Sequence, residues 1–319
     1  MEKNNLKNGI AIEVEGLTKS FNGKVVVDDL KLRVKRGNIY GFLGPNGSGK
    51  TTTLRMLCGL LTPDRGRGTC LGHDILKDRW LIKERVGYMT QHFSLYHDLT
   101  IKENLEFIAR IYGLKNPKRA VLEAIDQLGL MERKDQLAGQ LSGGWQQRLA
   151  LSACILPKPE LLLLDEPTAG VDPKARREFW NELHTLASEG LTVLVSTHYM
   201  DEAERCHEIA FIASGQLLTH GTVEDVLLNS GLQTWTVTTA DPHSLALELQ
   251  KTIGIDMVAP FGTSLHVSGR DARLLEQAIQ SYQNREELIW KKSLPSLEDV
   301  FIDLMHQKGK NNNQKSLSL

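Results

Sequence analysis

Short runs of apolar residues with the character of β-strands recur along the first two thirds of the chain. Alternation of apolar and polar residues predicts strands at 10–17 and 25–34. Three unbroken apolar runs predict strands buried on both faces, at 38–43, 161–164 and 192–196. Because amphipathic stretches separate these runs, the pattern predicts an α/β fold built around a parallel sheet.

Helical periodicity accounts for much of the sequence between these strands. The first helix is expected at 50–60, where Leu54, Leu57 and Leu61 share one face. Further helical segments are expected around 91–100, at 101–111, at 118–128 and from just after Gly143. These segments predict a helical subdomain at about 92–158.

The pattern changes after Gly221. A strand, a helix, two strands, a helix and a strand are predicted in that order, at 234–238, 243–251, 257–261, 264–267, 273–282 and 287–291. This order suggests a small α+β module of ferredoxin-like kind. The expected organisation is a main domain at 1–225, an accessory module at 226–306 that ends in an amphipathic helix at 296–305, and a disordered polar tail at 307–319.

The charge balance limits the classes of partner. The chain has 319 residues, of which 38 are basic and 39 acidic, so its formal net charge is -1. Nucleic-acid-binding proteins usually carry a basic excess or stripe, and no nucleic-acid partner is therefore expected. No apolar run approaches the ~18 residues of a membrane span, and the first residues do not have the pattern of a signal peptide. If the protein works at a membrane, another polypeptide is expected to cross it.

The four cysteines indicate a reducing compartment. They are Cys58, Cys70, Cys154 and Cys206. Their spacing contains no CxxC pair and no histidine at zinc-site distance, so neither a zinc site nor a disulfide framework is expected.

The turn after the third predicted strand carries the strongest chemical signal. Residues 44–51 fit the pattern G-x-x-x-x-G-K-[ST] between a strand and a helix. Glycines let successive backbone N–H groups surround phosphate oxygens, Lys50 is expected to reach the β and γ phosphates, and the Thr51 hydroxyl is expected to bind Mg²⁺. A glycine-rich turn without a ligand is the alternative. The residues expected to hold the nucleotide are Gly44, Pro45, Asn46, Gly47, Ser48, Gly49, Lys50, Thr51 and Thr52.

Two carboxylates follow the apolar run at 161–164. Asp165 and Glu166 are placed at the carboxyl end of a buried strand, where ligands bind in open α/β sheets. Asp165 is suited to hold Mg²⁺ directly or through water, and Glu166 is the candidate to accept a proton from the attacking water. The alternative is that this segment only caps a helix that begins near Asp172.

The whole set of motifs, in this order, resembles the nucleotide-binding domain of ATP-binding cassette (ABC) proteins over residues 10–221. The loop at 44–51 is similar to the family's Walker A motif, 161–166 to Walker B and 141–145 to the signature motif. The resemblance implies a P-loop ABC-ATPase fold, with a mixed sheet core, a helical subdomain and an antiparallel β subdomain. It also implies roles for the adenine-stacking Phe21, the Q-loop Gln91 near the metal, the signature residues Ser142, Gly143 and Gly144, the D-loop Asp172 and the switch histidine His198.

The resemblance further implies a site shared between two copies of the domain. In the family, ATP bound to the Walker A loop of one subunit is covered by the signature motif of the other, and ATP and Mg²⁺ are the cofactors. A second nucleotide-binding domain, in a homodimer, is therefore an expected partner. The family's signature usually has glutamine in its fifth place, where this chain has Trp145.

Transport is the expected use of the hydrolysis. The segment at 294–301 resembles the end of ATPase subunits of ABC-2 type exporters, including multidrug-export ATPases. This implies separate transmembrane permease subunits and a peripheral location on the cytoplasmic face of the inner membrane. Phe93, Leu95 and Tyr96 either form a groove for a helix of that partner or belong to the core. The alternative function is a soluble ABC ATPase that acts on nucleic acid or ribosomes.

Overall fold

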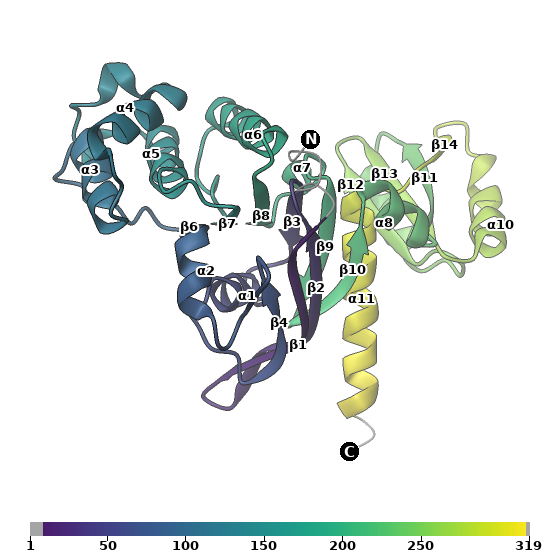
Figure 1. Ribbon diagram of the computed structural model, residues 1–319. Helices are drawn as coiled ribbons and strands as arrows, with labels where there is room; N and C mark the ends of the chain where they lie inside the picture. Colours follow the sequence, from purple (N-terminus) through teal and green to yellow (C-terminus); the bar gives the residue numbers. More distant parts are fainter. Residues whose placement is uncertain (1–8, 317–319) are drawn as a thin grey trace. The chain divides into compact units, whose positions relative to one another are not determined.

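The computed structural model describes residues 9–316, which divide into two compact units between His220 and Gly221. The first unit is built on a six-stranded sheet with the order β10-β9-β3-β8-β7-β6 (Figure 1). Its strands are β3 (Ile39–Leu43), β6 (Val86–Met89), β7 (Leu161–Asp165), β8 (Thr192–Thr197), β9 (Glu208–Ala213) and β10 (Gln216–Gly221). Strand β3 pairs in parallel with β8 and β9, and β7 pairs in parallel with β6 and β8. Every residue of β3, β7 and β8 is buried, which confirms the expectation from the three apolar runs.

A second, antiparallel sheet in the same unit has the order β2-β1-β4-β5. It consists of β1 (Ile10–Phe21), β2 (Lys24–Lys35), β4 (Arg65–Cys70) and β5 (His73–Asp74). Helix α1 (Lys50–Leu57) follows β3 along the chain, and helix α2 (Arg79–Arg85) lies between β5 and β6.

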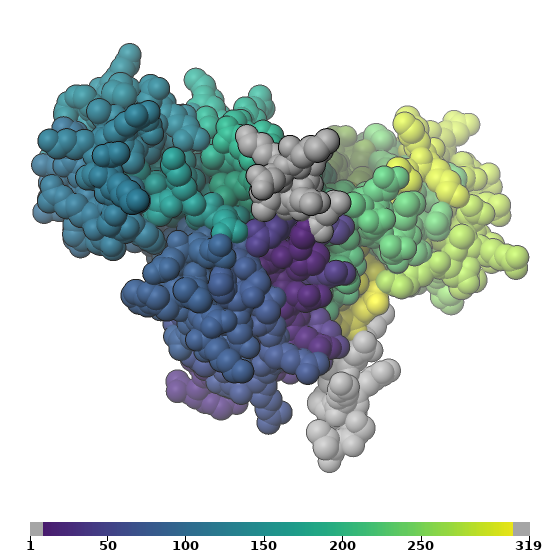
Figure 2. Space-filling view, in the orientation of Figure 1, coloured from purple at the N-terminus to yellow at the C-terminus, as the bar shows by residue number. Residues whose placement is uncertain are grey.

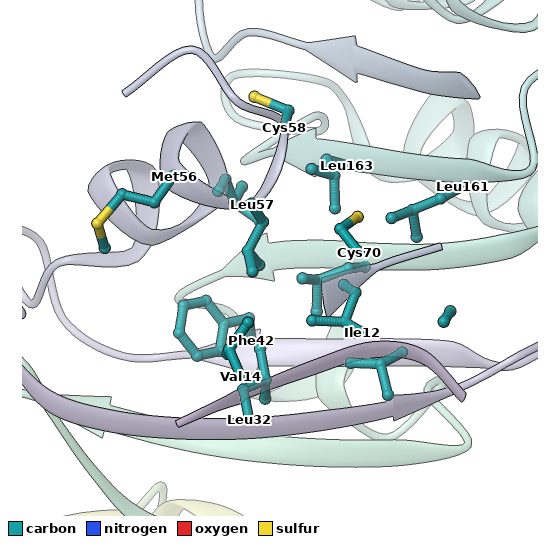
Figure 3. Close-up of a cluster of buried hydrophobic side chains, with 14 of the residues drawn as sticks. Ile12, Val14, Leu32, Phe42, Met56, Leu57, Cys58, Cys70, Leu161 and Leu163 are labelled. Carbon is teal, nitrogen blue, oxygen red and sulfur yellow. The ribbon is translucent and has the colours of Figure 1, made fainter. Parts of the chain in front are cut away.

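The main hydrophobic core joins these elements, and Figure 3 shows part of it. Ile12 and Val14 of the antiparallel sheet, Phe42 of β3, Leu57 of α1 and Leu163 of β7 belong to one buried cluster. Burial of these side chains holds β3 and α1 at fixed positions, and the loop between them is fixed as a result. All four cysteines are free thiols, and burial raises the pKa of Cys58 to about 11 and that of Cys70 to about 12.

The middle part of the first unit's sequence forms a group of helices, which Figure 2 shows as a lobe to one side of the strands. Its main helices are α3 (Ile101–Ile111), α4 (Pro117–Gln127) and α5 (Gly143–Ile155), with short 3-10 turns at Met131–Arg133 and Ala138–Gln140. The three predicted helices of this region are confirmed to within about a residue. Helices α6 (Pro173–Ser188) and α7 (Met200–Ala203) follow β7 and β8.

The prediction of a helical stretch around 91–100 is wrong. These residues form an irregular loop, and α3 begins only at Ile101. The reason is a capping box at Thr100, whose side chain accepts from the Glu103 N–H while Glu103 accepts from the Thr100 N–H. Because an N-cap residue has non-helical backbone angles, the helix cannot extend backwards through it.

The second unit is an α+β module with its own core. Its antiparallel sheet has the order β12-β13-β11-β14, which is the ferredoxin-like order suggested by the sequence. The strands are β11 (Gln233–Thr238), β12 (Met257–Phe261), β13 (Ser264–Gly269) and β14 (Ile289–Ser293). The helices are α8 (Val223–Asn229), α9 (Pro242–Leu249), α10 (Ala272–Gln283) and α11 (Leu297–Ser316). Val237, Leu249, Leu265 and Ile279 are among the residues of the buried cluster.

Helix α11 continues well past 305, where the pattern predicted its end. Residues 307–316 of the expected disordered tail are helical, and residues 317–319 lie outside the described part of the chain. Once the apolar first turns of α11 are packed, each further residue adds a helical hydrogen bond without a new nucleation cost. No helix within residues 9–316 is long and apolar enough to cross a membrane.

Candidate functional site

The Walker A loop lines a cleft of about 310 Å³ at the carboxyl end of the central strand β3. The lining residues are Val26, Asn46, Gly47, Ser48, Gly49, Lys50, Thr51, Thr52, Gln91 and Glu166. The cleft therefore brings together most of the phosphate loop, one carboxylate from the end of β7 and the glutamine that follows β6.

Two glycines of the loop are required by the surrounding backbone. A Cβ atom at Gly44 would lie 2.2 Å from the carbonyl oxygen of Ile212 on β9. Gly49 has a φ of +104°, and a Cβ there would lie 2.7 Å from the carbonyl oxygen of Val26. Side chains at these positions would push the loop away from its neighbours, so the loop needs glycine to close over β3.

The loop presents donors and a buried positive charge to the cleft. Gly49 is the N-cap of α1 and makes no side-chain cap, so the first N–H groups of the helix have no partner from a capping side chain. Lys50 is buried, and its Nζ donates to the Gly44 carbonyl oxygen at 2.7 Å. Ser48 Oγ is buried without a hydrogen-bond partner among the described residues. The helix N–H groups, the Ser48 hydroxyl and the positive charge of Lys50 together fit an anion, and the phosphate chain of a nucleotide supplies one.

Asp165 is held in place by three hydroxyl groups. Its Oδ1 accepts from Thr51 Oγ1 at 3.1 Å and from Ser196 Oγ at 2.7 Å, and its Oδ2 accepts from the Tyr88 hydroxyl at 3.4 Å. Burial raises the pKa of Tyr88 to about 12, so this hydroxyl remains a donor at neutral pH. The carboxylate is thus fixed beside the Thr51 hydroxyl, the other oxygen that the sequence assigned to a metal.

The Glu166 carboxylate lies close to three other residues predicted for the site, Lys50, Gln91 and His198. Its Oε1 lies 3.2 Å from Lys50 Nζ, and its Oε2 accepts from Gln91 Nε2 at 3.2 Å. His198 Nδ1 lies 3.3 Å from the same Oε2, and this nitrogen has no hydrogen-bond partner among the described residues. Glu166 has a φ of +46°, a left-handed conformation that is unusual for a non-glycine residue. Its N–H donates to Ser196 Oγ at 3.0 Å, which helps to hold the turn.

The signature residues and Asp172 form a separate cluster outside the lining of this cleft. Ser142 is the N-cap of α5 and makes no side-chain cap, and Ser142 and Gly143 are exposed. A Cβ at Gly144 would lie 2.7 Å from Ala175 Cβ, so this glycine lets α5 approach α6 closely. Asp172 caps α6 by accepting from the Lys174 and Ala175 N–H groups at 3.0 Å, so the N-cap of this helix is Asp172 and not Asp165 or Glu166.

Phe21 also lies apart from the cleft lining. It is at the tip of the β1–β2 hairpin, 45% exposed, with Lys19 Nζ 5.6 Å from its ring centroid. Its exposed ring is available for stacking, while Val26 of the same hairpin borders the cleft.

Sequence reasoning missed Tyr88 and Ser196, which hold Asp165 from two neighbouring strands. Ser196 has a weak sequence signal, since it is a polar residue directly after the apolar run 193–195 of β8, and the structure pairs it with Asp165 in register. Tyr88 has none, because only the sheet order places β6 beside β7.

Comparison with known proteins is consistent with this geometry. The profile of the ABC transporter family matches residues 27–169. The chain is 34% identical over 303 residues to the Nod factor export ATP-binding protein I of Rhizobium sp. (strain N33), covering 92% of this chain and 97% of that one. The chain belongs to the ABC transporter family of ATP-binding proteins.

Other relatives of this ATP-binding cassette are similar over most or part of their length. It is 36% identical to the daunorubicin/doxorubicin resistance ATP-binding protein DrrA of Streptomyces peucetius, with 92% of each chain covered. It is 43% identical over 223 residues to the probable multidrug ABC transporter ATP-binding protein YbhF of Escherichia coli (strain K12), but this match spans only 38% of that longer relative. A solved ATP-binding subunit of an ABC transporter superposes on 69% of the chain with a TM-score of 0.63 and 28% identity.

Membership of this family establishes which reaction the domain carries out. The chain binds and hydrolyses ATP, and the expected P-loop ABC-ATPase fold is confirmed.

Proposed function

We propose that this chain is the ATP-hydrolysing subunit of an ABC-2 type exporter that works with separate transmembrane permease subunits. The observation that carries the proposal is the match, over 92% of the chain, to ATP-binding proteins named for Nod factor export and for daunorubicin resistance. The chain itself would be peripheral, on the cytoplasmic face of the inner membrane, held there by its partners.

The proposed nucleotide site uses the donors of the cleft. Lys50 and the N–H groups of the loop bind the phosphates, and Phe21 stacks on the adenine. Mg²⁺ takes one or two carboxylates together with phosphates and water, which fits a site without a larger cluster. The described residues contain no group of three or more His, Cys, Asp or Glu that could hold a metal. The proposed metal ligands are Thr51 and Gln91 with Asp165, which binds directly or through water.

In the proposed mechanism, Glu166 accepts a proton from the attacking water and His198 senses the γ-phosphate. His198 Nδ1 lies 3.3 Å from Glu166 Oε2, so the imidazole is beside the proposed base at the end of β7. Ser142, Gly143 and Gly144 of a second copy would close over the nucleotide with the exposed N-terminus of α5, and Asp172 would lie at the same interface.

A groove beside the Gln91 loop is the proposed docking site for the permease. It has a volume of about 140 Å³ and is lined by Phe93, Leu95, Ile108 and Tyr112 among other residues. Phe93 and Leu95 are only half-buried and Tyr96 is exposed, so these residues are available to a partner and do not form the core. An apolar helix of the permease fits a groove of this chemistry.

The proposal is tested by co-expression of the tagged full chain with the membrane protein encoded beside it, followed by purification in mild detergent. We expect a multi-span partner to co-purify in equal amount. Leu95→Asp should lower its recovery by about tenfold, because a charge enters the apolar groove. Leu122→Asp, at a position of α4 that is 42% exposed, is the matched control and should have no effect. Recovery of ribosomes or DNA in place of a membrane protein would instead support the soluble ABC ATPase.

A further inference from the structure

Glu202 is a fully buried carboxylate that the proposed mechanism does not use. It lies on the short helix α7, four residues after His198, and its exposed fraction is 0%. Buried carboxylates are costly unless hydrogen bonds and an opposite charge compensate them. The partners of Glu202 therefore indicate what its burial supports.

Two threonine hydroxyls donate to the two carboxylate oxygens. Thr168 Oγ1 donates to Glu202 Oε1, and Thr197 Oγ1 donates to Oε2 at 2.6 Å. Both threonines are buried, with 1% of their surface exposed. Thr168 lies two residues after Glu166, and Thr197 lies immediately before His198. The Glu202 carboxylate therefore joins the loop that carries Glu166 to the loop that carries His198.

Arg176 of α6 completes the arrangement. Its Nε lies 3.5 Å from Glu202 Oε1, too poorly aligned for a hydrogen bond but close enough to balance the charge. Its guanidinium also lies 4.3 Å over the ring of Tyr199, which in turn packs against His198 with ring centroids 4.1 Å apart. The backbone of His198 is thus held on both sides, by Thr197 and by Tyr199.

We propose that Glu202 is a positioning residue for ATP hydrolysis, which sets the distance between Glu166 and His198 by binding the loop of each. The inference rests on the proposed roles of Glu166 and His198 and not on transport. Glu166 has the left-handed φ of +46°, a conformation that persists only where its surroundings enforce it. Glu202 does not line the cleft, and its side chain accepts hydrogen bonds from Thr168 and Thr197, so its effect is expected mainly on the catalytic step and less on nucleotide binding.

The first test measures ATP hydrolysis by the full chain. In Glu202→Ala the two loops separate, and kcat should fall by about tenfold or more while KM for ATP changes by less than about twofold, since small displacements of catalytic groups are costly. Glu202→Gln retains an acceptor and a donor for the two hydroxyls and should keep at least about a third of kcat. Glu204→Gln, at an exposed position two residues after Glu202, should behave like the unmodified protein.

Threonine variants keep the test decisive if Glu202→Ala does not fold. Thr168→Val and Thr197→Val each remove one hydroxyl without changing shape, and each should lower kcat by about three- to tenfold. Thr192→Val is the matched control, because Thr192 is equally buried but lies at the opposite end of β8, where its hydroxyl accepts from the Gly37 N–H. If Thr168→Val and Thr197→Val are no slower than Thr192→Val, the inference is overturned.

A double-mutant cycle separates positioning from general loss of structure. Glu202→Ala should slow the His198→Ala protein by less than about threefold, because the group that it positions is already absent. Equal slowing in both backgrounds, or a raised KM with unchanged kcat, would overturn the inference. The single variants Glu166→Gln and His198→Ala, measured alongside, test the roles of those two residues independently of Glu202.

Discussion

At the scale of single residues, Trp145 is the clearest departure from the usual signature motif. The guanidinium carbons of Arg133 and Arg148 lie over its indole ring, 4.7 and 5.1 Å from the centroid. Arg148 also donates to the Leu128 carbonyl oxygen at 3.1 Å and to Glu178 on α6 at 2.7 Å. Arg148, which lies on α5 with Trp145, therefore links this helix to the end of α4 and to α6, and the Trp145 ring packs against Arg148 and against Arg133 of the 3-10 turn.

Trp145→Ala should lower the free energy of unfolding of the first unit by about 1–2 kcal/mol, because two cation–π contacts and some packing are lost. Trp145→Phe keeps a ring under both guanidinium groups and should recover about half of that loss. Urea unfolding of the full chain, followed by far-UV circular dichroism, measures the difference. Trp80→Ala is the control, since Trp80 is 71% exposed. Equal losses in the Ala and Phe variants would exclude the cation–π explanation.

At the scale of elements, Asn104 connects helix α3 to the loop that follows Gln91. Asn104 is fully buried, and its Oδ1 accepts from the Tyr96 N–H at 2.9 Å. Its Nδ2 donates to the carbonyl oxygens of Tyr96, Leu99 and Thr100, at 2.9, 3.3 and 3.0 Å. The Asn104 side-chain amide thus supplies hydrogen-bond partners for backbone groups of the loop at 91–100, which has no regular secondary structure of its own.

Asn104→Ala should lower the free energy of unfolding by about 2 kcal/mol, because buried backbone groups of the loop lose their partners. It should also speed hydrogen exchange at residues 91–99, measured by mass spectrometry. Asn116→Ala is a suitable control, because Asn116 is exposed and makes no capping hydrogen bond at the start of α4. Unchanged exchange in Asn104→Ala would show that other contacts hold the loop.

The elements also show how far sequence reasoning extends. Helix α3 was predictable because local periodicity and the Thr100–Glu103 pattern lie within one stretch of chain, and that pattern also carries the signal that the helix starts at Ile101. The phosphate loop was predictable because its glycines and Lys50 are contiguous. The burial of Glu202 was not, because the acidic stretch around it is typical of an exposed helix and its partners Thr168 and Arg176 are distant in sequence.

At the scale of the whole molecule, the nucleotide cleft and the signature cluster of one chain are separate features. The signature cluster does not line that cleft, and its exposed N-terminus is the kind of anion site that a second copy would supply. We propose a nucleotide-dependent homodimer on this basis, in which hydrolysis would remove the phosphate that bridges the two copies.

Glu166→Gln should trap the closed dimer, because ATP is bound but the water is not activated. We expect ATP with Mg²⁺ to shift this variant from monomer to dimer in sedimentation-velocity experiments, while ADP does not. His220→Ala serves as the control, because His220 does not line the cleft and this variant keeps Glu166 as the proposed base. If ATP leaves the Glu166→Gln protein monomeric at every concentration tried, the shared-site scheme fails.

The central place of β3 in its sheet determines when during synthesis the ATP site is completed. Ile39 pairs with Val193, and Tyr40 pairs with Glu208, so the two neighbours of β3 are made about 150 and about 170 residues after it. At roughly 5–20 residues per second, the phosphate loop leaves the ribosome roughly 8–30 s before the strands that flank it. During that interval the apolar strand β3 has no partner on either side. A nascent chain that stops before β8 therefore contains the whole Walker A sequence and no site for ATP.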